Sequence, residues 1–75
     1  LLMYLGQLAY GRSLWGKAQS YLEASIALQP SIAARLMLAR VLDETGQPQK
    51  AQEQRKLVLE AVSDDERHAA LEQHS

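Results

Sequence analysis

Few residues of this 75-residue chain could perform chemistry, and their spacing does not suit metal binding or catalysis. His68 and His74 are six positions apart, so a helix does not bring both imidazoles to one face as an i, i+4 pair would. No cysteine is present to complete a metal or haem site. Ser63 precedes three acidic residues in the order of a helix capping box, which explains them without catalysis. We therefore expect no enzyme, no metal ligand and no cofactor.

One group of charged and apolar residues has the spacing of a single helix face. Four residues follow at i, i+4, i+7 and i+8, which is one face of a helix: Leu36, Arg40, Asp43 and Glu44. A face with one Arg, two carboxylates and an apolar side chain would suit a peptide of mixed polarity. The alternative is an ordinary surface pair of Arg40 with Asp43 or Glu44, which contributes about 0.2–0.5 kcal/mol.

Turn and cap residues divide the chain into the helices that carry these side chains. Ala and Leu are abundant and Phe is absent, which favours interlocking helices over sheets. We expect helices over about residues 1–11, 14–29, 32–45 and 48–62, with Ser31 as an N-cap, Gly46 as a left-handed stop and Pro48 in a first turn. The capping box at Ser63 predicts a fifth, short helix over about residues 64–73.

The helices repeat at a fixed interval. Ala18 aligns with Ala51 and Gly6 with Ala39, and the two separations are equal, since 51 − 18 and 39 − 6 give the same value. We call this separation the repeat interval. The second copy is less regular, because arginine stands at positions 35 and 55 where the first copy is apolar. One stripe of the second helix is expected to face the core: Ala18, Tyr21, Leu22, Ser25, Ile26 and Leu28. Trp15 is expected to be a structural anchor between helices.

Charge and hydropathy exclude two classes of partner. The formal net charge is −1, so no overall field attracts nucleic acid or an anionic membrane. No segment is apolar for long enough to cross a bilayer, because Gln7 interrupts the opening stretch.

The first repeat resembles a tetratricopeptide repeat (TPR). The residues that carry the resemblance are Leu2, Leu5, Gly6, Ala9, Ala18, Leu22 and Pro30. Within that family, the run from Leu14 to Ser25 and the Leu-Gln-Pro at 28–30 are similar to the C-terminal repeats of bacterial HemY proteins. The resemblance implies an all-α fold of antiparallel hairpins in a right-handed solenoid, with repeats over residues 1–30 and 31–62 and a capping helix and tail over 63–75. We expect the chain to be a fragment of a longer protein.

The resemblance also implies a function in binding. HemY proteins are anchored in the bacterial inner membrane and are associated with late haem biosynthesis, so we expect a scaffold for haem-pathway enzymes on the cytoplasmic side. The first helix of each TPR hairpin lines a concave groove. Here the groove positions are Met3, Gln7, Tyr10, Ala33, Leu36, Arg40, Asp43 and Glu44.

The alternative is a structural end cap whose groove binds nothing. The first helix is apolar nearly all round, since Leu1, Met3, Tyr4 and Leu8 add to its inner face. Another helical pair of the parent protein would cover this face. In its absence we expect a homodimer through the Leu1–Leu8 helix.

Overall fold

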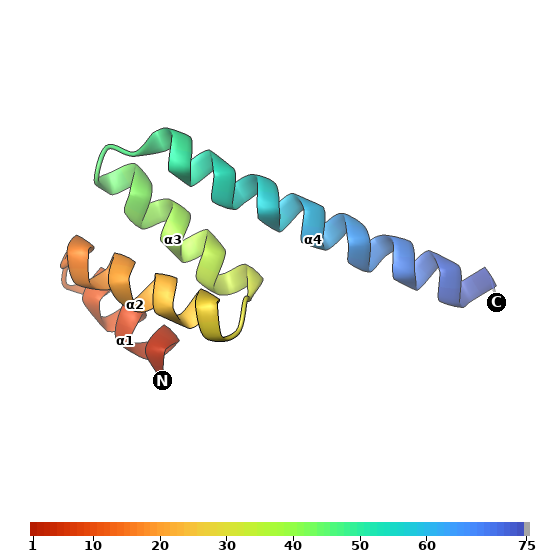
Figure 1. Ribbon diagram of the computed structural model, residues 1–75, viewed down its shortest axis with the longest axis horizontal. Coiled ribbons are helices and arrows are strands. Elements are labelled where there is room, and N and C mark those ends of the chain that lie inside the picture. The colour runs from red at the N-terminus through yellow and green to blue at the C-terminus, as the bar shows by residue number, and fades with distance from the viewer. Residues whose placement is uncertain (75) are drawn as a thin grey trace.

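The computed structural model describes the backbone of residues 1–74 and the side chains of residues 1–64. That stretch holds four helices and no strand: α1 (Leu2–Gly11), α2 (Trp15–Leu28), α3 (Ile32–Glu44) and α4 (Pro48–His74). The all-helical prediction is confirmed. α1 lies antiparallel to α2 and α3 lies antiparallel to α4, so the chain forms two helical hairpins (Figure 1). Helix α3 packs on α2 and touches α1, whereas no Cα atom of α2 lies within 8 Å of one of α4 among the described residues.

The turns of the two hairpins are built alike, one repeat interval apart. Two residues beyond each first helix the backbone is left-handed, at Ser13 (φ 58°) and Gly46 (φ 74°). The amide of that residue donates to the carbonyl three positions back, at 3.0 Å in the first turn and 3.2 Å in the second. The next amide donates to the carbonyl five positions back, at 2.9 and 2.8 Å. Both turns are therefore Schellman motifs, and the prediction for Gly46 is confirmed.

The predicted start signals of α3 and α4 are also confirmed. Ser31 has extended backbone angles, and its Oγ accepts a hydrogen bond of 3.1 Å from the amide of Ala34. That bond satisfies one of the free amides in the first turn of α3. Pro48 is the first residue of α4, where its missing N–H costs no helical hydrogen bond.

Helix α4 is longer than the sequence pattern indicates. It is continuous from Pro48 to His74, so the helix end at Val62 and the separate helix over 64–73 are wrong. Its 27 residues span about 40 Å, against about 20 Å for the 13 residues of α3, so α4 continues past its partner (Figure 1). No Gly or Pro follows Pro48 to end the helix. The capping preference of Ser63, about 1 kcal/mol, does not offset the hydrogen bonds that a break would lose.

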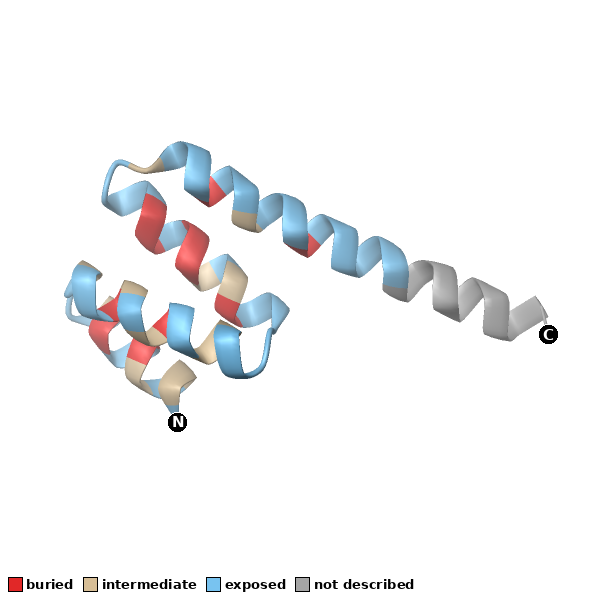
Figure 2. Cartoon of the chain, viewed as in Figure 1, coloured by how far each residue is buried: buried red, intermediate tan, exposed pale blue. Residues whose placement is uncertain are grey.

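The core lies along the seams between adjacent helices, with much of it on α3 (Figure 2). Gly6 permits the closest approach, because a Cβ added there would lie 2.9 Å from Cγ and Cδ2 of Leu22. The fully or nearly fully buried apolar residues are Ala9, Ala18, Leu22, Ala34, Leu38, Ala39, Val41, Leu42, Ala51 and Val58. Leu28 is 79% exposed, so its assignment to the core is wrong. It follows the last buried turn of α2, where the chain already leaves the seam.

Candidate functional site

The residues predicted to line a groove lie on α1 and α3. Gln7, Arg40 and Glu44 are exposed, and Leu36 is 43% exposed. Met3 and Tyr10 are half-buried and pack against the core, so each offers a partner only part of its surface. The apolar share of this α1–α3 surface is therefore smaller than the residue types alone suggest.

Tyr10 is held by Trp15 at the start of α2. The two rings meet edge to face, with centroids 5.4 Å apart and an interplanar angle of 70°. Trp15 is half-buried and packs against the core, as predicted for a structural anchor. The contact fixes the aromatic side chain at the turn end of the α1–α3 surface.

Asp43 has a partner on α4 and not on its own helix. Its Oδ2 accepts from Nη2 of Arg55, and the two side chains are 42% and 43% exposed. This is the only salt bridge among residues 1–64, so the predicted pairing of Arg40 with Asp43 or Glu44 does not form. Arg40 and Glu44 consequently remain as separate exposed charges on α3.

The two arginines that break the repeat pattern both connect α3 with α4. Arg35 donates from Nη1 to Oε1 of Gln54 at 3.1 Å, and Arg55 reaches Asp43. Their repeat-equivalent positions in the first hairpin are Leu2 and Leu22, which are apolar. The second hairpin therefore replaces part of an apolar seam with polar bridges at its edges.

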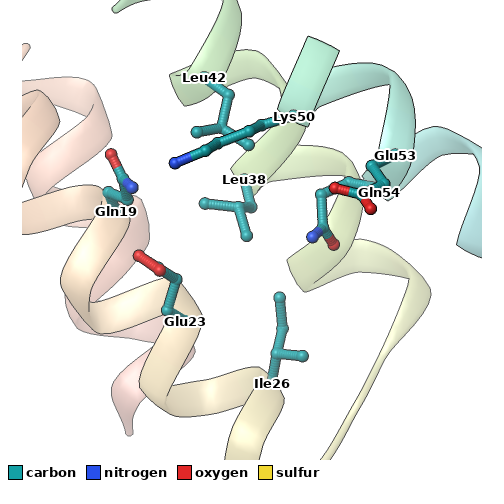
Figure 3. A pocket seen from close by; sticks show the side chains of 8 residues that line it. All are labelled: Gln19, Glu23, Ile26, Leu38, Leu42, Lys50, Glu53 and Gln54. Atoms are coloured by element: carbon teal, nitrogen blue, oxygen red, sulfur yellow. The ribbon is translucent and has the colours of Figure 1, made fainter. Parts of the chain in front are cut away.

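A hollow that sequence reasoning missed lies between α2, α3 and α4, and we call it the junction pocket (Figure 3). Its volume is about 230 Å³. It exists because α2 and α4 both pack on α3 but not on each other. The lining residues are Gln19, Glu23, Ile26, Leu38, Leu42, Lys50, Glu53 and Gln54. They come from three helices, so no local sequence pattern could have indicated them.

Apolar side chains form the floor of the junction pocket and polar ones its rim. Leu38 and Leu42 are 4% and 3% exposed, and Ile26 stands beside them on the α2 side (Figure 3). Lys50 extends from α4 toward the side of Gln19, while Glu23 projects from α2 (Figure 3). The ionisable side chains of the rim are Glu23, Lys50 and Glu53.

The described residues contain no group of three or more His, Asp or Glu side chains that could hold a metal ion. The side chains of His68 and His74 lie outside the described residues, as do those of Ala69, Ala70 and Leu71 on the predicted capping helix. None of the helices within residues 1–74 is both long and apolar enough to span a bilayer.

The described helices define an all-α protein made of two hairpins that follow one another at the repeat interval. No protein-family model, curated protein or solved structure matches the chain.

Proposed function

We propose that this chain is a protein-interaction module of the TPR type, without catalytic activity. The observation that supports the proposal is the periodicity of the backbone. The ends of α1 and α3, at Gly11 and Glu44, are one repeat interval apart, and so are the starts of α2 and α4, at Trp15 and Pro48. The turn hydrogen bonds repeat at the same interval. Repeats of this kind present side chains from equivalent helices as one extended surface.

The α1–α3 surface is the proposed binding face. It offers exposed charges of both signs at Arg40 and Glu44, an exposed amide at Gln7 and a partly exposed Leu36. A partner peptide of mixed polarity could form hydrogen bonds with the amide and ion pairs with the charges. Asp43 contributes less, because Arg55 already neutralises it.

A narrower proposal concerns the biological setting. The run from Leu14 to Ser25 supports a HemY-like parent protein, anchored in the bacterial inner membrane and associated with late haem biosynthesis. The partners would then be haem-pathway enzymes, bound on the cytoplasmic side.

Titration of late haem-pathway enzymes onto the full chain tests both proposals. Arg40→Glu should weaken binding by at least tenfold, because it places a repulsive charge at the centre of the face. Arg12→Glu is the matched control, since it makes the same charge change at an exposed turn residue. If both variants bind with the affinity of the unsubstituted chain, the α1–α3 surface is not the binding face.

A specific observation also favours self-association through α1. On α3, Ala34, Met37 and Val41 are buried or half-buried. The repeat-equivalent residues of α1 are exposed by 94%, 59% and 43%: Leu1, Tyr4 and Leu8. Equivalent residues are thus covered on α3 and exposed on α1. A second copy of the chain would cover the exposed residues of α1.

Light scattering over a concentration series distinguishes this alternative. If the chain dimerises through α1, the unsubstituted chain should have twice the monomer mass. Tyr4→Glu, which places a charge on that exposed face, should be a monomer. An unsubstituted chain that stays monomeric at high concentration would rule the dimer out.

A further inference from the structure

We propose that the junction pocket is a second binding site, which takes one bulky apolar side chain of a partner peptide next to a Lys or Arg. The site does not depend on the α1–α3 surface. Residues two positions apart lie about 200° apart around a helix, so Leu38 and Leu42 face away from Leu36 and Arg40. The chain therefore carries two binding faces on opposite sides of α3.

The size of the pocket selects one side chain. Its volume of about 230 Å³ is below the roughly 300–1,000 Å³ that is typical of small-molecule sites. A Leu, Met or Phe side chain of a peptide fits this space as an anchor on the floor of Leu38, Leu42 and Ile26. Leu38 and Leu42 are already almost covered by the fold and Ile26 is half-buried, so an anchor would remove the rest of this apolar surface from water.

The charges at the rim select a cation beside the anchor. The lining residues include two carboxylates, Glu23 and Glu53, and one amine, Lys50. Together they carry an excess of one negative charge. None of the three takes part in an ion pair with another described side chain. A Lys or Arg that neighbours the anchor residue would meet Glu23 on the α2 side or Glu53 on the α4 side.

Gln54 supplies a fixed polar contact at the same rim. Its Oε1 accepts from Arg35 at 3.1 Å, which orients the side-chain amide. The amide nitrogen is then left to donate to a backbone carbonyl of the peptide.

Comparison with the first hairpin shows that the pocket needs both hairpins. The repeat-equivalent residues line a hollow of about 160 Å³ on the first hairpin: Leu5, Ala9, Lys17 and Tyr21. That hollow has no wall equivalent to the one that α2 adds at the junction. Ser20 also stands where the junction pocket has Glu53, so the pair of acidic residues at the rim is particular to the junction.

The test uses the full chain, labelled with nitrogen-15, and the synthetic peptide acetyl-Lys-Leu-Lys-amide at millimolar concentration. We expect the backbone resonances of Leu38, Leu42 and Ile26 to shift on titration. Replacing the Leu of the peptide with Ala should weaken binding at least tenfold, because the apolar anchor is lost. Glu23→Gln should weaken it about threefold, and adding Glu53→Gln should bring the total to about tenfold.

Two controls separate this site from the α1–α3 surface. Glu60→Gln removes an exposed carboxylate outside the pocket and should leave the affinity unchanged. Arg40→Glu should also leave it unchanged, whatever its effect on the partner of the α1–α3 surface. Shifts confined to α1 and the Arg40 face of α3, or equal binding of acetyl-Glu-Leu-Glu-amide, would overturn the proposal.

Discussion

Replacing Gly6 with alanine is expected to destabilise this protein, although the same change stabilises most helices. The added Cβ would lie 2.9 Å from two carbons of Leu22, a distance that side chains do not tolerate. Leu22 is completely buried, so it cannot move into solvent to relieve the contact. Overpacking of this kind costs about 1–3 kcal/mol, and the higher helix propensity of alanine returns about 0.5–1 kcal/mol.

The midpoints of these two ranges leave a net loss of about 1 kcal/mol, and each kcal/mol lowers the Tm of a domain this small by roughly 4–8 °C. Thermal and urea unfolding, monitored by circular dichroism at the helical band, measure this loss of stability. Gly16→Ala is the matched control, because a Cβ at that position of α2 meets nothing within 4 Å. That variant should be stabilised by about 0.5–1 kcal/mol, so the same substitution should have opposite signs at the two glycines.

A double-mutant cycle with Leu22→Ala isolates the cause. Leu22→Ala alone should cost about 2–5 kcal/mol, and Gly6→Ala should become stabilising in that background because the clash is gone. If Gly6→Ala raises the Tm of the parent chain, the close approach of α1 and α2 does not restrict the side chain at residue 6, and the packing argument fails.

The remaining predictions concern the turns, a cap and the exposed ion pair. Ser13→Gly should stabilise the chain by about 1 kcal/mol, because Ser13 carries left-handed strain, and Gly46→Ala should destabilise it by about 1 kcal/mol; matching urea midpoints for the two variants would refute this. Ser31→Ala should cost about 1 kcal/mol through loss of the α3 cap, and an unchanged midpoint would count against the cap. A cycle of Asp43→Ala and Arg55→Ala should give a coupling of about 0.2–1 kcal/mol that falls in high salt, since both side chains are more than a third exposed; a larger, salt-independent coupling would contradict this.

The hairpins could be predicted from the sequence because their determinants are local. Ser31, Gly46 and Pro48 act on the turns that contain them, and the interval between Gly6 and Ala39 can be read directly from the chain. The residue type of Ser13 does not indicate a left-handed backbone, because serine has no preference for that conformation. Its repeat equivalence to Gly46 is the signal that could have identified it.

Features that depend on two helices at once could not be predicted. Arg55 occupies the position equivalent to Leu22, and only the placement of α3 beside α4 shows that it binds Asp43. The capping box at Ser63 is a real local preference, yet a helix start requires a helix end before it, and nothing ends α4 there. The junction pocket depends on how far α2 and α4 diverge over α3, which is a property of packing.

Among the described residues, the backbones of the two hairpins approach each other closely only at α3. In a linear array of nearest neighbours, cooperativity is carried by the interfaces between adjacent units. The 13 residues of α3 supply the second hairpin's side of this close approach. Whether the chain melts in one transition or two is therefore decided within this helix, and a ligand seated against its buried leucines would make the two halves unfold together.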